Sequence, residues 1–190
     1  NMAQAHIDSC NNSLVNVPHV EKFTVKLVPF ALNDGYYNLS GIDGVYDISS
    51  DTVKQINETH THPFFECVIN PDVVATNSLK EVVEFSDILV LSVPTKVIRG
   101  VMEEIKKYIT SKKLFINVSK GIEPKTLLTV SGIAEEIFTS SEMRGFVTLS
   151  GPSHAEEVIK RKLTLLVAAS KNIKDAELVQ QIFSNNTYMR

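Results

Sequence analysis

Cysteine is scarce in this 190-residue chain, and other marks of specialised protein classes are missing as well. The two cysteines, Cys10 and Cys67, cannot build a disulfide framework, and they lie too far apart for a CxxC metal or redox motif. Such usage fits a reducing compartment. No apolar run approaches the ~20 residues of a membrane-spanning helix, and no secretory signal pattern opens the chain. We therefore expect a cytoplasmic protein without a membrane span.

Clustered positive charge is also lacking. The formal net charge is -3, and the longest basic cluster is Lys160-Arg161-Lys162. A nucleic-acid surface needs an extended basic stripe that displaces counterions from phosphates, so we expect no nucleic-acid partner. His60 and His62 are two close candidate metal ligands, but no third ligand follows at a known spacing. We expect no metal site.

What the chain does contain is a regular alternation of apolar runs and amphipathic segments. The apolar run 88–93, ended by Pro94, is typical of a strand covered on both faces. Apolar residues then recur at helical spacing (positions 97, 98, 101, 102, 105 and 109), which predicts a helix with Thr95 as N-cap. The same reasoning predicts strands at 114–118, 146–149 and 163–168, helices at 127–138 and 176–183, and a short helix near 155–160.

Upstream signals are shorter but of the same kind. Residues 23–28 and 73–75 are strand candidates, and 51–56 suggests a helix capped by Ser49 or Ser50. The spacing Ser78-x-x-Glu81 is that of a capping box. Strands separated by helices imply right-handed crossovers, so we predict an α/β fold with a doubly wound, mostly parallel sheet and helices on both faces. Residues 1–20 are assigned to an N-terminal extension and 21–190 to one domain.

Ligands of an open parallel sheet bind beyond the carboxyl ends of its strands, which directs attention to the three loops that follow residues 93, 118 and 149. Lys120 follows one predicted strand, and its ammonium suits a phosphate or an oxygen that gains negative charge. Gly151 follows another strand and leaves room for a ligand, while Ser153 stands where helix N–H groups could hold an anion. The alternatives are a solvated Lys120, plain helix capping by Ser153-x-x-Glu156, and a His154 that packs or faces solvent.

These loops carry a resemblance to a known family. The sequences Ser-Lys-Gly-Ile-Glu-Pro at 119–124 and Leu-Ser-Gly-Pro-Ser-His-Ala-Glu-Glu at 149–157 resemble the paired signatures of bacterial-type NAD(P)-dependent glycerol-3-phosphate dehydrogenases. Residues 56–60, 74–79 and 86–95 resemble further segments of the family in the same order. The resemblance extends from about Tyr46 to Tyr188 and implies a Rossmann-like dinucleotide-binding domain.

The resemblance also implies a reaction and its residues. Hydride would pass between NAD or NADP and the pair dihydroxyacetone phosphate and glycerol 3-phosphate, a step toward glycerophospholipid precursors. Lys120 would contact the substrate and the cofactor, Gly151 and Ser153 would line the substrate site, and Ala155 with Pro94 and Thr95 would border the cofactor. The family's helical domain, which supplies the general-base lysine, would begin after Arg190, and the intact enzyme could be a homodimer. Without that domain we expect exposed apolar surface and association.

One departure from the family keeps other functions open. The family has Gly-x-Gly-x-x-Gly directly after its first strand, so that the backbone can approach a pyrophosphate. Here Gly35, Gly41 and Gly44 have a different spacing, and Pro29 removes a backbone donor. A non-catalytic Rossmann-like remnant or phosphate-binding module is therefore the alternative. A related hydroxyacid dehydrogenase is a third reading, against which the 119–124 motif argues.

Overall fold

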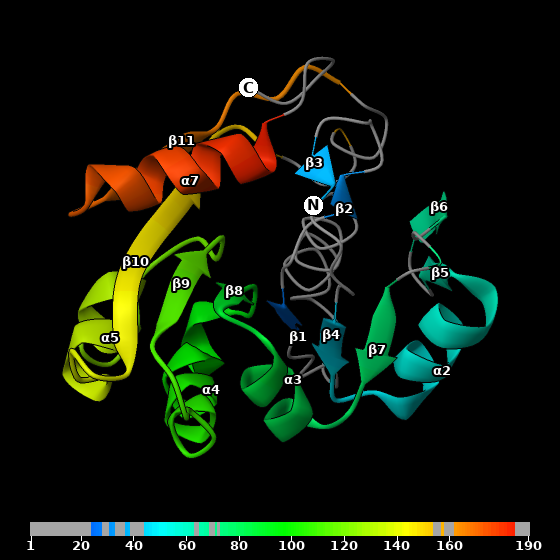
Figure 1. Ribbon diagram of the computed structural model, residues 1–190, viewed down its shortest axis with the longest axis horizontal. Helices are drawn as coiled ribbons and strands as arrows, with labels where there is room; N and C mark the ends of the chain where they lie inside the picture. Colours follow the sequence, from blue (N-terminus) through cyan, green and yellow to red (C-terminus); the bar gives the residue numbers. More distant parts are fainter. Residues whose placement is uncertain are drawn as a thin grey trace.

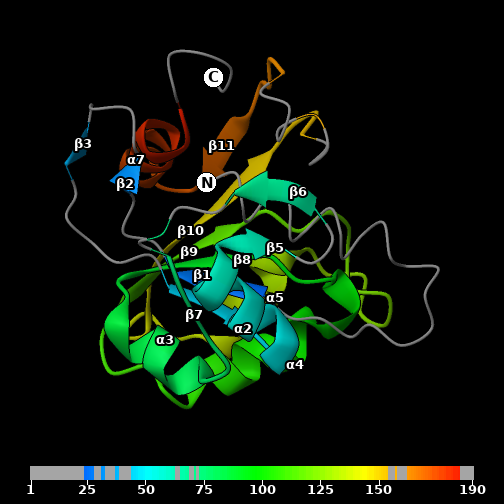
Figure 2. The same ribbon diagram turned by 90° about the vertical axis from the view of Figure 1, so that its right-hand side faces the viewer.

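The computed structural model contains a seven-stranded sheet with helices on both faces (Figures 1 and 2). It describes residues 24–27, 31–32, 37–38, 44–62, 65–68, 71, 73–153, 157 and 162–184, with the backbone alone at 24–27, 31–32, 37–38, 62 and 65–68. The strands of the main sheet are β1 (Thr24–Leu27), β4 (Gly44–Asp47), β7 (Val74–Thr76), β8 (Ile88–Leu91), β9 (Lys113–Asn117), β10 (Met143–Ser150) and β11 (Val167–Ser170). Two small sheets pair β2 (Ala31–Leu32) with β3 (Tyr37–Asn38), and β5 (Thr61–His62) with β6 (Phe65–Val68). The helices are α2 (Ser50–Thr59), α3 (Leu79–Phe85), α4 (Thr95–Lys106), α5 (Val130–Ile137) and α7 (Ile173–Phe183).

The order of the main sheet is β11-β10-β9-β8-β1-β4-β7. From β7 to β10 this is the 3-2-1-4-5-6 order of a doubly wound nucleotide-binding sheet. β8, β9 and β10 are parallel, as are β4 and β7. Because β1 is antiparallel to both β4 and β8, those two strands point the same way. Only β1 and β11 oppose the common direction within this sheet, so the predicted doubly wound, mostly parallel α/β fold is confirmed.

The core follows from strict alternation along the buried strands. Leu89 and Leu91 pack with α3, α4 and α5, whereas Val90 between them packs with α7 on the opposite face. Val45 of β4 packs under α2, and both Val45 and Val90 lie opposite Lys26 in the ladder, so α2 and α7 share a face. Figure 2 shows α7 on the other side of the central strands from α3 and α4. The continuous apolar runs read from the sequence therefore do belong to strands covered on both sides.

Side-chain hydrogen bonds confirm two of the three predicted helix caps. Ser49 accepts from Thr52 N and caps α2, and Ser78 accepts from Glu81 N and caps α3. Thr95 is not the N-cap of α4, as predicted, but its first helical residue, because Pro94 takes the cap position without a side-chain bond. The predicted strand 163–168 also begins later: residues 163–166 contain only an isolated bridge residue at Thr164, and the ladder with β10 covers Val167–Ser170.

Some expectations concern residues outside the described ranges. The extension 1–20 and the residues His154, Ala155 and Glu156 are among them. Within the described ranges, no helix combines the length and the apolar character that crossing a membrane requires.

Candidate active site

Three loops leave the sheet from one edge, because the strands before them are parallel and in register. Leu91 of β8 lies opposite Asn117 of β9, which lies opposite Thr148 of β10. The chain therefore continues from this common edge into Ser92–Thr95, into the segment after Asn117, and into the loop after Ser150. These are the three loops that the sequence selected.

A pocket of about 300 Å³ opens between two of these loops. Lys120 and Gly121 line it on the β9 side and Ser150 on the β10 side, with Ser131 from the first turn of α5. Lys120 is exposed, and its ammonium forms no hydrogen bond or ion pair with any residue for which the structure gives a position. A cation thus stands at the rim of a pocket without a protein partner there, where it can meet an anionic ligand.

Ser119, the residue before Lys120, links the ends of β8 and β9. Its hydroxyl accepts a hydrogen bond from Val93 N at 3.1 Å and reaches the carbonyl oxygen of Leu91 at 3.4 Å. Asn117, the last residue of β9, holds the turn that follows it. Ser119 N donates to Asn117 Oδ1, and Asn117 Nδ2 donates to the Ser119 carbonyl, both at 3.1 Å. The position of Lys120 is therefore tied to the turn that leads into Pro94.

Gly121 brings the Lys120 segment close to the start of α4. Its φ of 109° lies in the left-handed region that side chains rarely adopt. A β-carbon at Gly121 would stand 3.5 Å from Thr95 Oγ1, so the glycine faces the first residue of α4 directly. The residues assigned to the cofactor side, Pro94 and Thr95, and the residue assigned to the substrate, Lys120, are thus neighbours at one edge.

Gly151 and Ser153 form a tight turn after β10. Ser153 N donates to the Gly151 carbonyl at 2.9 Å, and the Ser153 hydroxyl lies 3.4 Å from the same oxygen. Ser150 lines the pocket that Lys120 lines, and Gly151 follows it directly. The two loops therefore lie on the same side of the molecule, as an active site requires.

An ion-pair cluster behind Lys120 was missed at the level of sequence. Arg99 of α4 donates from Nε and Nη2 to the two carboxylate oxygens of Glu123, each at 2.8 Å, and from Nη2 to Glu136 of α5 at 2.9 Å. Thr126 also donates to Glu123. These hydrogen bonds, that of Arg99 first, hold the pKa of Glu123 at about 2. Glu123 lies in the 119–124 motif, but nothing in the sequence names Arg99 as its partner.

The pyrophosphate end of a dinucleotide finds a poorer fit. Leu27, the last residue of β1, lies opposite Leu89 near the amino end of β8. β1 therefore ends at the edge opposite the three loops, and the sequence after it lacks the glycine spacing that lets a backbone approach a pyrophosphate. Among the residues that the structure describes, Thr95, Lys120 and the amino end of α4 offer polar groups at the edge from which the three loops leave. They do not provide a glycine-rich cradle.

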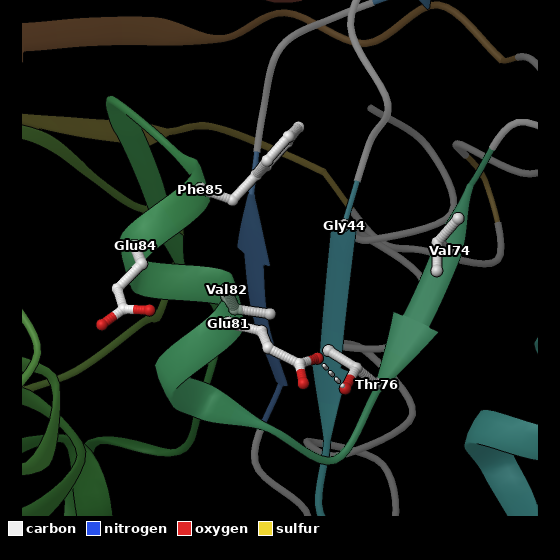
Figure 3. A pocket seen from close by; sticks show the side chains of 7 residues that line it. All are labelled: Gly44, Val74, Thr76, Glu81, Val82, Glu84 and Phe85. Atoms are coloured by element: carbon white, nitrogen blue, oxygen red, sulfur yellow. Dashed lines mark hydrogen bonds between the residues drawn. The ribbon is translucent and has the colours of Figure 1, made fainter.

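A larger pocket of about 590 Å³ lies elsewhere, between α3 and the strands β4 and β7 (Figure 3). Its walls include Val74, Val82 and the exposed ring of Phe85, and Glu81 on its rim is already bonded to Thr76 at 3.0 Å. None of its lining residues follows β8, β9 or β10. Size alone does not make it the site, because its polar groups do not converge on its interior. Across the described ranges, no three metal-binding side chains gather into a cluster.

Comparisons with known proteins point to one family. The model of the family described as NAD-dependent glycerol-3-phosphate dehydrogenase N-terminus matches residues 44–176. The glycerol-3-phosphate dehydrogenase [NAD(P)+] of Acholeplasma laidlawii is 47% identical over 146 residues, which cover 77% of this chain and 44% of that protein. The protein of the same name from Bacillus subtilis is 40% identical over 141 residues, covering 73% of this chain and 41% of that one. The chain spans less than half the length of these relatives.

Solved structures show the same fold. A glycerol-3-phosphate dehydrogenase from Coxiella burnetii superimposes with a TM-score of 0.64 at 20% identity, covering 75% of this chain and 44% of that one. The Plasmodium falciparum glycerol-3-phosphate dehydrogenase gives 0.65 at 21% identity, with coverage of 73% and 40%. The family match begins at Gly44, the first residue of β4, so β1 lies outside it.

Proposed function

The chain belongs to the family of NAD-dependent glycerol-3-phosphate dehydrogenases, and from this premise we propose that it is the nucleotide-binding part of such an enzyme. The proposed reaction joins dihydroxyacetone phosphate, NAD(P)H and a proton to give glycerol 3-phosphate and NAD(P)⁺, or runs in reverse. Whether NAD or NADP is used is open. The part of the relatives that this chain does not span would supply the general base and the remaining phosphate contacts.

The observation that carries the proposal is the place of Lys120. Its ammonium stands at the rim of the pocket that Ser150 also lines, without a protein partner among the described residues. When the carbonyl of dihydroxyacetone phosphate is reduced, its oxygen gains negative charge. A fixed cation nearby lowers the energy of that state more than the energy of the neutral ketone, and the gain is largest where water is excluded. The same charge would attract the substrate phosphate.

The cofactor side is proposed from the neighbouring turn. A nicotinamide would supply or take up the hydride. Pro94 and Thr95 start α4 beside Gly121, so the Thr95 hydroxyl and the amino end of α4 would border the reacting ring. Gly151 and Ser153 would shape the substrate side, because their turn is compact and directly follows the pocket wall at Ser150. Ala155 is proposed to approach the cofactor on the strength of the resemblance.

A second candidate function rests on β1. The carboxyl end of this strand lies at the edge away from Lys120, so the loop after it starts far from the place where a dinucleotide pyrophosphate would lie. A module that holds a phosphate through Lys120 but no nicotinamide would fit that arrangement. The two candidates differ in one measurable property, the binding of NADH or NADPH.

Titration of the chain with NADH and NADPH, followed by nicotinamide fluorescence and by thermal stability, separates them. The dehydrogenase proposal expects saturable binding of at least one dinucleotide, with a rise in melting temperature. If neither dinucleotide binds at millimolar concentration while inorganic phosphate still stabilises the chain, the phosphate module is the better description.

The role of Lys120 needs a matched pair of variants. Lys120→Met removes the cation at the pocket, whereas Lys125→Met removes an exposed cation from the same segment. In the intact enzyme we expect Lys120→Met to lower turnover at least about a hundredfold, as loss of a charge-assisted contact to a developing anion does, with nearly unchanged dinucleotide affinity. Lys125→Met should retain turnover. Equal turnover of Lys120→Met and the wild type would remove Lys120 from the site.

Two further expectations accompany this proposal. The enzyme would work in the cytoplasm, in keeping with the small charged substrates and with two cysteines that are too few for a disulfide framework. It would also be a homodimer, an expectation for which sedimentation of the intact enzyme is the direct measurement.

A further inference from the structure

Glu123 is the inward anchor of an otherwise exposed segment. Residues 120–122 and 124–127 are all exposed, whereas Glu123 is 8% exposed and receives both donors of the Arg99 fork. A planar guanidinium that meets a carboxylate through two parallel hydrogen bonds fixes direction as well as distance. Arg99 lies in the second turn of α4, a rigid element whose first residue borders Gly121.

We propose that Arg99 is a positioning residue that acts through Glu123 on Lys120. The inference rests on the proposed role of Lys120 as a substrate contact and adds what holds that lysine in place. Arg99 has two tasks in this arrangement. It fastens the segment to α4, and it neutralises a carboxylate that lies only three residues from the Lys120 ammonium.

The backbone around Glu123 transmits this anchoring to the rest of the segment. Glu123 N donates to the Leu128 carbonyl, and Leu127 N donates back to the Glu123 carbonyl, both at 2.9 Å. Ile122 pairs with Thr129, the N-cap of α5, in an isolated antiparallel bridge. The segment 122–129 is therefore a closed loop with Glu123 at its base.

The other side of Lys120 is fixed by Ser119, whose hydroxyl is bonded to the end of β8. Between these two anchors stand only Lys120, Gly121 and Ile122. With both ends held, the span has few alternative conformations, and Gly121 supplies the left-handed turn that it needs. Without the Arg99 contact, this end would be held only by the backbone bridge of Ile122 to Thr129 and by the backbone hydrogen bonds of Glu123.

The charge argument points the same way. Without Arg99, the Glu123 carboxylate would lack its main counterion, and the cations on its own segment are Lys125, which already acts on it, and Lys120, three residues before it. Pairing with Lys120 would occupy the ammonium that the pocket presents. Glu136 offers a built-in comparison, because the same Arg99 Nη2 atom bonds it, yet it lies on α5 and is 54% exposed.

The test uses the intact enzyme and follows dihydroxyacetone phosphate binding as the KM for this substrate at saturating NADH. Arg99→Gln is expected to weaken dihydroxyacetone phosphate binding about tenfold, a typical effect of losing a charge-assisted contact, with NADH affinity within about twofold of wild type. Arg99→Lys keeps the charge without the fork and should recover part of the loss. Glu136→Gln, the matched control, should bind like the wild type.

A spectroscopic readout separates this inference from the proposed function. Carbon-13 methylation of the lysines gives an NMR signal for Lys120 in the chain without ligand, assigned with Lys120→Arg. We expect that signal to shift in Arg99→Gln and to keep its place in Glu136→Gln.

An unshifted Lys120 signal in folded Arg99→Gln, or equal effects of Arg99→Gln and Glu136→Gln, overturns the inference. If wild type fails to bind dihydroxyacetone phosphate, the proposed function fails, and the signal alone decides the role of Arg99. If Arg99→Gln does not fold, Arg99→Lys decides by the same two readouts.

Discussion

Gly151 lies directly against the backbone of Leu165. A β-carbon on Gly151 would stand 2.2 Å from the Leu165 carbonyl oxygen and 3.2 Å from the carbon bonded to it. The requirement for glycine here comes from this close approach, and its φ is not in the left-handed region. The turn at Gly151 is thus in close contact with the backbone of the segment that leads into β11.

Gly151→Ala should therefore destabilise the chain, because the new methyl group meets backbone that cannot rotate away. We expect a loss of about 1–3 kcal/mol in the free energy of unfolding, the usual cost of forced overpacking. Gly100→Ala is the control: Gly100 lies inside α4, and a β-carbon there would meet no described residue beyond its own helix within 4 Å. It should gain about 0.5–1 kcal/mol from helix propensity. Urea unfolding of both variants measures the contrast, and equal effects would show that the contact with Leu165 is not tight.

Most strands and helices of this fold could be predicted from local sequence patterns. Their apolar residues are buried against neighbouring elements, and burial leaves a regular spacing in the sequence. The run 88–93 and the stripe after Pro94 became β8 and α4, since continuous apolar character and 3.6-residue spacing report burial directly. Ser78 could likewise be identified as a cap, because its partner lies three residues away. The positions of Lys120 and Ser150 on one edge followed from the parallel order of their strands.

Long-range relationships could not be predicted in the same way. Arg99 and Glu123 lie 24 residues apart, and nothing local marks either as the partner of the other. The reversed direction of β1 also has no local signature, because a four-residue strand of alternating polar and apolar residues fits a sheet in either direction. The contact of Gly151 with Leu165 depends on how two loops meet, which periodicity does not encode.

Ser119→Ala should lower stability through one buried donor. Val93 is 2% exposed, and its N–H would lose the Ser119 hydroxyl as acceptor. An unsatisfied buried N–H costs about 1–3 kcal/mol, which urea unfolding can resolve. Ser131→Ala is the matched control, because Ser131 lines the same pocket but, among the described residues, its hydroxyl bonds only the exposed Thr129 hydroxyl. A loss in Ser131→Ala as large as that in Ser119→Ala would contradict the link between β8 and β9.

Acid should weaken the chain partly through Glu123. Arg99 lowers the pKa of Glu123 from its ordinary 4.5 to about 2. The folded state therefore binds this proton less readily than the unfolded state does, so the stabilisation is complete above pH 4.5 and is lost as the pH falls toward about 2. The difference in unfolding free energy between wild type and Glu123→Gln should shrink across that window. Glu84→Gln, the same change on the surface of α3, controls for the substitution; a constant difference for Glu123→Gln would argue against the pair.

Alkali should act in the opposite sense through Lys113. This lysine is 1% exposed and donates to the Ser86 carbonyl, and burial lowers its pKa below the ordinary 10.5. As the pH rises toward 10.5, the folded state gives up this proton before the unfolded state does, so the unfolded state binds more protons and stability increases. Lys113→Met should lack this gain. Chemical unfolding between neutral pH and 10.5 measures it, with exposed Lys112→Met as the control; parallel profiles of wild type and Lys113→Met would disprove the shift.

The apolar stripe formed by Leu163, Leu165 and Val167 should make the chain associate. These side chains are 68%, 57% and 67% exposed, and they alternate with inward residues such as Thr164, which is 1% exposed. An apolar stripe beside the edge strand β11 favours pairing with another apolar surface. Sedimentation velocity over a range of concentrations should show concentration-dependent association of the wild type.

Leu163→Ser combined with Val167→Thr should shift the chain toward the monomer, whereas Phe85→Ser, at an exposed ring of α3, should not. A wild type that stays monomeric at high concentration, or a double variant that associates as strongly, would show that this stripe needs no partner.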